Sequence, residues 1–559
     1  MYLRTIQRRN KDGSVVRYVQ LAHNVRHPGS GNAVAEVIHS FGREDQLDRD
    51  ALGRLVRSIA RYLGPEAELE ATAADSAKTA PLRFVSSKAL GGAWVLDQLW
   101  RRLGVPEVLF KLVAGRRLDG RAERVLFALV ANRALEPLSK LAATRWVGER
   151  AAIPGLDSVD DDACYRAMDW LLEVEAELAA AVYFAVADLL NLEVDLLFFD
   201  TTSTYFEIES ADDPAAGETV GFRTFGHSKD HRPDLPQVIV GMAVTRTGIP
   251  IRVWCWPGNT NDQALIRQVK DDLRAWKLAR VVWVADRGFS SAANRRYLQR
   301  AGGHYIIGEK LRGESKEAAA ALARQGRYRT VAGNLRVKEV VVDDRVMRDR
   351  FVVCHNPEQA ERDNTVRDQL VAQLTDAITG SDRLSKTARA ELAGRLRAHP
   401  GYRRFLRTTP GGLLRIDRAA IAAETKFDGK FLLRTSDPTL SAEDVALGYK
   451  QLLEVERGWR DMKSTLELRP VYHRLEDRIR AHVLLCWLAL LLIRLAETAT
   501  GQTWRNLRHE LDRMHLGEFT GSAGRVLQRT ETTPGQAAIL GALGLAEPKR
   551  FFDITPAGA

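Results

Sequence analysis

The spacing of hydrophobic and polar residues changes several times along this chain of 559 residues. Alternation near the N-terminus, as in "SVVRYVQLAHNV", predicts strands, whereas three- and four-residue spacing from Ala89 onward predicts helices. Continuous apolar runs then predict buried strands, and helical spacing returns at Ser441. The predicted segments are a small β-rich module (1–64), a linker (65–84), a helical region (85–192), the first part of a central core (193–309), an insertion (310–440), C-terminal core helices (441–515) and a helical tail (516–559).

Two of the apolar runs end at an aspartate. The run "VDLLFFD" ends at Asp200, and "RVVWVAD" ends at Asp286. Runs that are apolar on both faces are typical of central strands covered by helices on each side. The pattern therefore predicts an α/β fold with a mixed sheet flanked by helices, in which functional groups gather where strands end.

These two aspartates indicate a metal site. An ionised carboxylate beside an apolar core is costly unless a charge compensates it. A divalent cation shared by Asp200 and Asp286 would do so, and Mg²⁺ is often held by one or two carboxylates together with water and phosphate. Taken singly, each aspartate is more simply explained as a turn residue. Their occurrence at the same structural position favours the metal site.

A third acidic residue lies in "YKQLLEVERGWRDMKS", at 449–464. On one continuous helix, a single face would carry Tyr449, Leu452, Glu456, Trp459, Arg460 and Lys463. A carboxylate facing a metal ion, with a lysine seven residues further on facing phosphate, suits phosphodiester chemistry. Glu454 lies about 200° around the helix from Glu456, so both cannot face one site. A solvated amphipathic helix with ordinary salt bridges is the alternative.

Composition adds a preference for a polyanionic partner. Lysine and arginine outnumber aspartate and glutamate by 82 to 72, which gives a net charge of +10 and a pI near 9.4. This excess makes nucleic acid the first candidate. Four scattered cysteines without a Cys-x-x-Cys pair argue against structural zinc and indicate a reducing compartment. The N-terminus does not resemble a signal peptide, and the apolar run at 483–493 is too short to span a bilayer, so we expect a cytoplasmic protein without a membrane partner.

Together these motifs resemble bacterial insertion-sequence transposases of the DDE superfamily, whose core is RNase H-like. The matching pieces are "FFDTTSTYF", "VADRGF" and a helix signature of Tyr, Arg, Glu and Lys, and "GHSKDHRPDLPQV" and "LELRPVYHRLEDRIRAHV" are also typical. The resemblance covers about residues 85–515 and, more weakly, the N-terminal module. It points to the branch with a β-rich insertion between the second and third acids. Leu452 stands where the signature has Arg, and Arg457 or Arg460 would take over its phosphate contact.

The resemblance implies a DNA transposase that cleaves the ends of an insertion sequence and joins them to target DNA by two-metal hydrolysis and strand transfer. Asp200, Asp286 and Glu456 would be the catalytic residues and the ligands of Mg²⁺, with Mn²⁺ as a substitute. The partners would be double-stranded DNA, as terminal inverted repeats and target, and a second copy of the chain in a synaptic homodimer. The protein would associate with the bacterial nucleoid when bound to DNA. A nuclease that cuts without joining and an inactive DNA-binding descendant are the alternatives.

Basic and aromatic residues supply the expected DNA contacts. The candidates are Lys463, Tyr449, Arg460, Arg457, Lys229, Arg232, Arg287, Arg403, Arg404 and Arg407. The last three lie in "RLRAHPGYRRFLRTTPGGLLR", where arginine alternates with aromatic residues in a way that suits a phosphate-tracking surface. A solvated loop or surface is the alternative for each group. Asp262, in "GNTND", is expected to cap a helix rather than approach the metal site.

Overall fold

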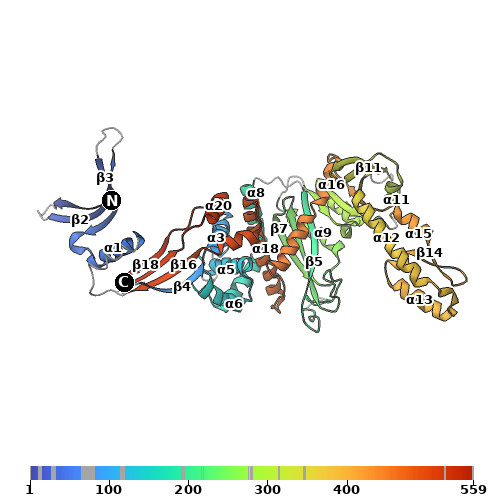
Figure 1. The fold of residues 1–559 in the computed structure, drawn as a ribbon, viewed down its shortest axis with the longest axis horizontal. Helices are drawn as coiled ribbons and strands as arrows, with labels where there is room; N and C mark the ends of the chain where they lie inside the picture. The colour runs from blue at the N-terminus through green and yellow to red at the C-terminus, as the bar shows by residue number, and fades with distance from the viewer. Residues whose placement is uncertain are drawn as a thin grey trace. The chain divides into compact units, whose positions relative to one another are not determined.

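The chain forms two compact units in a computed structural model (Figure 1). The terminal unit comprises Met1–Ala89, Met514–Thr532 and Pro548–Ala559, and the central unit comprises Leu90–Arg513 and Thr533–Glu547. The structure describes residues 2–9, 15–26, 33–63, 82–113, 120–190, 196–215, 217, 219–274, 276, 281–312, 315–343, 348–521 and 524–556. Residues 65–81 of the predicted linker therefore lie outside the described part.

The terminal unit contains two antiparallel sheets. The first has the order β1-β2-β3 and precedes helix α1 (Arg49–Leu63), and its strands are β1 (Tyr2–Arg9), β2 (Val15–Arg26) and β3 (Ala33–Arg43). The second has the order β18-β17-β16-β4, with β4 at Arg83–Ala89, β16 at His515–Gly521, β17 at Gly524–Arg529 and β18 at Phe551–Pro556. The alternating pattern near the N-terminus thus forms strands, as predicted.

The prediction of a helical tail at 516–559 is wrong. Strands β16, β17 and β18 lie in this segment, and β16 pairs with β4 from the other end of the sequence. A strand whose partner lies that far away leaves little trace in local periodicity. Among the described residues of the segment only α20 (Pro534–Ala542) is helical, and it begins with a capping box between Thr533 and Gln536.

Helices dominate the first part of the central unit, as the spacing predicts. They are α3 (Gly91–Arg102), α4 (Val105–Val113), α5 (Ala122–Leu135), α6 (Lys140–Arg145), α7 (Asp161–Glu173) and α8 (Glu175–Leu190). α5 and α7 pack against α18 (Glu476–Thr500). In the described part of the chain α18 is long and apolar enough to cross a membrane, but 94% of its most apolar window is buried inside the protein. It is therefore a core helix.

A nine-stranded mixed sheet forms the centre of this unit, in the order β10-β11-β12-β15-β9-β8-β5-β6-β7. β5 pairs antiparallel with β6, β6 pairs antiparallel with β7, and β8 and β9 run parallel to β5. In chain order these five strands lie 3-2-1-4-5, which is the RNase H-like topology, so the predicted fold class is confirmed. Their bounds are β5 (Leu196–Tyr205), β6 (Gln237–Thr245), β7 (Pro250–Pro257), β8 (Val282–Ala285) and β9 (His304–Glu309).

Strands of the insertion extend the same sheet, because β15 pairs antiparallel with β9. The added strands are β10 (Arg329–Ala332), β11 (Leu335–Asp343), β12 (Arg348–His355) and β15 (Lys430–Thr435), and α11 (Lys316–Ala323) packs on β11 and β12. Between β12 and β15 the chain forms a smaller core around Leu374, Phe405 and Leu414. Its elements are α12 (Pro357–Ile378), α13 (Lys386–Ala398), α14 (Tyr402–Phe405), β13 (Leu406–Thr408), β14 (Leu414–Ile416) and α15 (Arg418–Thr425).

Helices α16 (Ala442–Lys450) and α17 (Leu453–Ser464) cover one face of the central strands. A Cβ atom on Gly448 of α16 would lie 3.0 Å from Leu196 Cδ1, and one on Gly458 of α17 would lie 2.5 Å from Met242 Cε. Asp200 is an even number of residues from Leu196 and is the register partner of Met242. Because side chains alternate along a strand, Asp200 faces α16 and α17.

The other face of the central strands is covered by α9 (Asp262–Arg274) and α10 (Ala292–Leu298). Phe199 lies on this face, with its ring 5.4 Å from that of Phe289. Side chains of Trp254 and Trp256 on β7 donate hydrogen bonds to Asp272 and Gln268 of α9. The central strands are therefore covered by helices on both faces, and β5 continues beyond Asp200 with buried hydroxyl residues up to Thr204.

Candidate active site

Asp200 and Asp286 occupy corresponding positions on neighbouring parallel strands. Phe199 of β5 is in register with Ala285 of β8. Asp200 is the next residue of β5, and Asp286 is the first residue after β8. Adjacent strands lie about 4.8 Å apart, so this register brings the two carboxylates together. The structure thus joins the two aspartates that the sequence singles out.

Asp200 carries a charge that its surroundings compensate only in part. Burial is the largest cause that raises its pKa from 3.8 to about 6, and the nearby charges of Asp286 and Asp262 contribute to the same rise. Lys229 and a backbone hydrogen bond oppose this rise without reversing it. The ionised form of Asp200 is therefore disfavoured in the protein alone, and a cation bound beside the carboxylate would relieve this cost.

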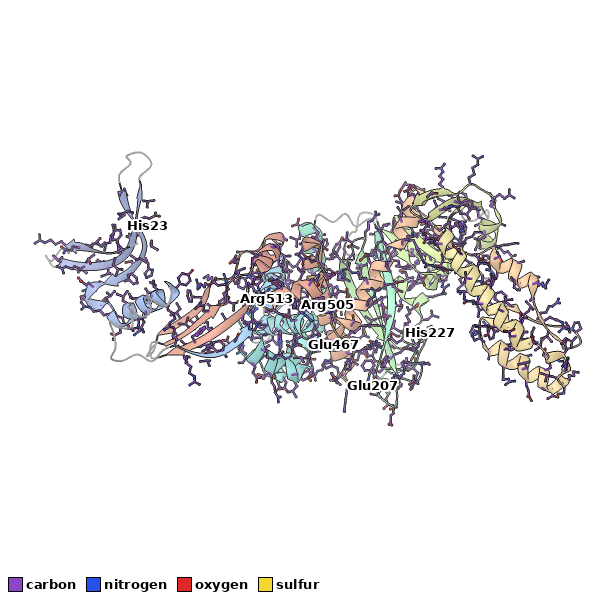
Figure 2. All side chains as sticks on the ribbon, viewed as in Figure 1. His23, Glu207, His227, Glu467, Arg505 and Arg513 are labelled. Atoms are coloured by element: carbon purple, nitrogen blue, oxygen red, sulfur yellow. The ribbon has the colours of Figure 1, made fainter. Side chains whose placement is uncertain are left out.

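Lys229 enters the site from the loop between β5 and β6, in which Figure 2 labels Glu207 and His227. Its Nζ lies 3.8 Å from Asp200 Oδ1 and 3.2 Å from Asp262 Oδ2. It donates hydrogen bonds to the carbonyl oxygen of Thr201 at 2.8 Å and to Thr201 Oγ1 at 2.5 Å. The lysine is therefore bound within the carboxylate cluster.

Asp262 belongs to this site, and the prediction that it caps a helix is wrong. The side chain of Asn261 accepts the hydrogen bond from the backbone N–H of Gln263 at 2.9 Å instead. Asp262 accepts a hydrogen bond from Thr201 Oγ1 at 2.7 Å and faces Lys229. The sequence places Asp262 shortly after β7, at the first residue of α9, and this position could have indicated that it lies near the site.

Tyr449 contacts the second aspartate. Its hydroxyl group donates a hydrogen bond to Asp286 Oδ1 at 3.2 Å. Burial, followed by the charge of Asp286, raises the pKa of Tyr449 well above its usual value. The phenol is therefore protonated at neutral pH and acts as a donor to the carboxylate.

The helix predicted at 449–464 is divided in two. Backbone hydrogen bonds between residues three apart, such as Leu452 N to Tyr449 O at 3.0 Å and Val455 N to Leu452 O at 3.1 Å, form a turn between α16 and α17. Tyr449 and Glu456 therefore do not share one continuous helical face. The turn directs the tyrosine to Asp286 and starts a second helix for the glutamate.

Two glutamates at the start of α17 have different surroundings. Glu454 lies against the β6–β7 turn, where a Cβ atom on Gly248 would be 2.7 Å from Glu454 Oε2. Glu456 is exposed, and its side chain forms no hydrogen bond or ion pair with the described residues. Its helix packs on Met242, beside Asp200, so Glu456 is on the same side of the sheet as that aspartate. Nowhere in the described ranges do three Asp, Glu, His or Cys side chains approach closely enough to hold a metal ion.

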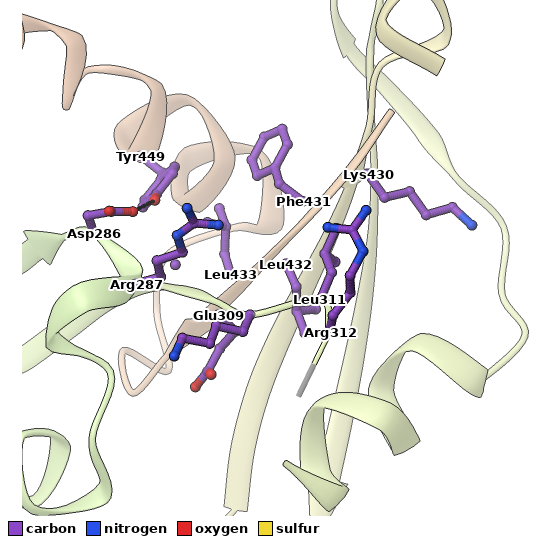
Figure 3. Close-up of a pocket in the computed structure, with 12 residues that line it drawn as sticks. Asp286, Arg287, Glu309, Leu311, Arg312, Lys430, Phe431, Leu432, Leu433 and Tyr449 are labelled. Carbon is purple, nitrogen blue, oxygen red and sulfur yellow. Dashed lines mark hydrogen bonds between the residues drawn. The ribbon is translucent and has the colours of Figure 1, made fainter. Parts of the chain in front are cut away.

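A pocket of about 390 Å³ opens beside Asp286. Figure 3 shows Asp286 and Tyr449 on one side and Arg312 and Lys430 on the other. Its cationic lining residues are Arg287, Lys310, Arg312 and Lys430. The rings of Phe431 and Tyr449 are stacked, with centroids 6.2 Å apart and an interplanar angle of 26°. Cations combined with aromatic rings suit a strand of nucleic acid.

Several of the predicted DNA contacts are engaged with acidic residues of the protein. The pairs are Lys463 with Asp230 at 2.8 Å, Arg232 with Asp234 at 2.8 Å, Arg457 with Glu497 at 3.1 Å and Arg404 with Glu424 at 3.2 Å. By contrast, Arg403, Arg407 and Arg460 are exposed and form no ion pair with the described residues. Of the predicted cations, Lys229 and Arg287 lie next to the aspartates, and the others do not contact them.

The aspartates fit a divalent cation on the chemistry of their surroundings. They supply oxygen donors from two neighbouring strands, and burial, the main cause of the raised pKa of Asp200, disfavours its charged form unless a cation accompanies it. Such carboxylates in an RNase H-like core beside a cationic pocket suit metal-dependent cleavage and transfer of phosphodiesters. Sequence similarity identifies the family within this class. Residues 217–492 match the transposase DDE domain, and residues 3–71 match the N-terminal domain of IS1634 family transposases.

The chain is therefore a DDE transposase of the IS1634 family, an enzyme class that cleaves DNA, transfers the cut strands and uses divalent metal ions. The DDE-domain match includes Asp286 and Glu456 and begins after Asp200. Among solved structures, a cryo-EM structure of a piggyBac transposase synaptic complex with hairpin DNA is similar over 76% of this chain and 79% of that one, with 11% identity and a TM-score of 0.35. None of the curated proteins matches the sequence.

Proposed function

We propose that this transposase cleaves the ends of its insertion sequence and joins them to target DNA with Mg²⁺, or Mn²⁺ in its place, held by Asp200, Asp286 and Glu456. The placement of Asp200 within β5 and of Asp286 just after β8, one residue beyond the paired Phe199 and Ala285, carries this proposal. Oxygen donors favour these ions over softer metals. Glu456 lies on the same side of the sheet as Asp200 and joins the pair when DNA is bound.

The residues of the chain orient the reacting groups. Asp200, Asp286 and Glu456 would hold divalent ions that, when bound, would make the attacking water more acidic and offset the negative charge on the leaving 3′ oxygen. Tyr449 fixes the Asp286 carboxylate through its hydrogen bond. Arg287 follows Asp286 and lines the pocket, where its guanidinium group pairs with a phosphate of the bound strand. No covalent protein–DNA intermediate is required, so no serine or tyrosine nucleophile is assigned.

The remaining parts of the chain hold the DNA. The exposed Arg403 and Arg407 of the insertion and Arg460 of α17 contact the phosphate backbone. The N-terminal module and the helical region at 85–192 recognise the terminal inverted repeats. Two subunits pair to hold two ends in a synaptic homodimer, and the enzyme acts in the bacterial cytoplasm on nucleoid DNA.

A strand-transfer assay tests this proposal. The substrate is a duplex that carries the terminal repeat with a free 3′-hydroxyl, and the target is a supercoiled plasmid. Wild-type protein should join the two in Mg²⁺, and Asp286→Asn should lower the rate by roughly three orders of magnitude while duplex binding stays within a few-fold. Nicking without joining would identify a nuclease, and near-normal joining by the variant would remove the metal-site assignment.

A further inference from the structure

Lys229 is held in the carboxylate cluster by contacts at both its ends. Its backbone N–H donates a hydrogen bond to Ser203 Oγ at 2.8 Å, which fixes the start of the side chain beside β5. Its ammonium group has three N–H bonds, and three oxygen atoms surround it: the Thr201 carbonyl, Thr201 Oγ1 and Asp262 Oδ2. The donors of this lysine are therefore directed at the protein rather than at DNA.

The neighbouring residue reinforces this position. Asp230 accepts hydrogen bonds from Lys463 at 2.8 Å and from Arg469 at 3.1 Å. Lys463 belongs to α17, so the loop that carries Lys229 is fastened to the helix that carries Glu456. The ammonium group is thus positioned by the fold and is not an unconstrained surface charge.

The ammonium group takes the place of a cation between two acidic residues. It lies 3.8 Å from Asp200 Oδ1 and 3.2 Å from Asp262 Oδ2, so it is the nearest positive charge to both carboxylates among the described residues. A divalent ion bound to Asp200 would lie within a few ångströms of it. Two cations at that separation repel each other strongly in a partly buried site.

We propose that Lys229, held beside Asp200 by Asp262 and Thr201, is a positioning residue that competes with the divalent ion for the Asp200 carboxylate and thereby sets the ion affinity of the active site. This inference rests on the proposed role of Asp200 as a metal ligand. Ion binding displaces the ammonium group toward solvent, where a DNA phosphate can accept it. Because coupling between two ligands is reciprocal, a phosphate that draws Lys229 away also tightens ion binding. Metal loading is in this way favoured when substrate is present.

Mn²⁺ binding to the full-length protein without DNA tests the proposal. Free Mn²⁺ is measured by electron paramagnetic resonance for wild type, Lys229→Met, Lys229→Gln and Lys229→Arg. The two neutral variants should bind Mn²⁺ at least tenfold more tightly, equivalent to about 1.4 kcal/mol, and the arginine variant should remain close to wild type. Two neutral side chains of different polarity keep the test valid if one of them impairs folding.

Lys386→Met is the matched control, because it removes the same charge from an exposed lysine of α13 that forms no ion pair with the described residues. Its Mn²⁺ affinity should stay within about threefold of wild type. Unchanged or weaker Mn²⁺ binding by both neutral Lys229 variants would overturn the inference, and so would an equal gain in Lys386→Met. Asp200→Asn distinguishes a failure of the proposed metal site from a failure of the proposed role of Lys229. If that variant binds Mn²⁺ as tightly as wild type, the proposed metal site itself fails.

Discussion

Replacing Asp200 by asparagine should stabilise the protein in the absence of divalent ions while abolishing its activity. Burial is the first cause that raises the folded-state pKa of Asp200 to about 6, from 3.8. Between these pH values the folded protein keeps a proton that the unfolded chain has lost. The free energy of unfolding therefore falls as the pH rises through this window and stays lower above it. Two pKa units correspond to about 3 kcal/mol, which is the largest gain expected from Asp200→Asn at pH 7.5.

Denaturant unfolding in EDTA measures this gain. The difference between Asp200→Asn and wild type should be about 1–3 kcal/mol at pH 7.5 and should shrink toward zero as the pH falls below 3.8, where Asp200 becomes protonated in both states. Added Mg²⁺ should stabilise wild type and leave the variant unchanged. A variant that is less stable than wild type in EDTA at pH 7.5 would refute the reasoning that the site carries uncompensated negative charge.

Asp212→Asn is a control for which the opposite change in the free energy of unfolding is expected. Burial tends to raise the pKa of Asp212, but hydrogen bonds from Arg223 outweigh burial and lower the pKa below its usual value. Its carboxylate therefore stabilises the folded state above the ordinary pKa of aspartate, and that contribution is lost as the pH falls through the lowered value. Asp212→Asn should accordingly destabilise the protein at pH 7.5. An equal gain in both variants would indicate a general effect of removing negative charge.

Three further predictions concern the third acid, the ion and the DNA contacts. Glu456→Gln should be inactive, whereas Glu454→Gln, whose side chain lies against the β6–β7 turn, should keep most of its DNA cleavage activity; the reverse result would assign the third acid to Glu454. EDTA should stop cleavage without unfolding the protein by circular dichroism, and Mg²⁺ or Mn²⁺ should restore it; cleavage in excess chelator would contradict the metal assignment. Neutralising Arg403, Arg404 and Arg407 together should flatten the dependence of log binding affinity on log salt concentration by up to about 3, mostly through the two arginines without an ion pair. An unchanged slope in that filter-binding experiment would place the DNA elsewhere.

Sequence patterns predicted the parts of the fold that depend on neighbouring residues. The apolar runs before Asp200 and Asp286 form the first part of β5 and all of β8, because strands covered on both faces are rich in apolar residues. The prediction that the first strand ends at Asp200 is wrong, since β5 continues to Tyr205 with buried hydroxyl side chains that carry no apolar signal. Because each aspartate directly follows such an apolar run, the sequence also predicted that the two carboxylates lie at corresponding positions on their strands. Alternating patterns also predicted the strands of the insertion at 310–440. They did not predict that these strands join the central sheet, which happens through the pairing of β15 with β9.

Features that depend on distant contacts were not predicted. The pairing of β16 with β4 joins residues from opposite ends of the sequence, and the tail was consequently assigned to helix. Asp262 was assigned to a cap because its partners, Lys229 and Thr201, come from other parts of the chain. The turn between α16 and α17 escaped detection because the apolar spacing continues through Leu452.

Locating Mn²⁺ by anomalous X-ray scattering in crystals of the transposase bound to a terminal-repeat duplex tests the central claim most directly. The account predicts a Mn²⁺ ion that contacts the carboxylates of both Asp200 and Asp286, with Glu456 as a further ligand and the Lys229 ammonium group withdrawn from Asp200. Mn²⁺ bound beside the scissile phosphate by other residues, with neither aspartate as a ligand, would contradict it.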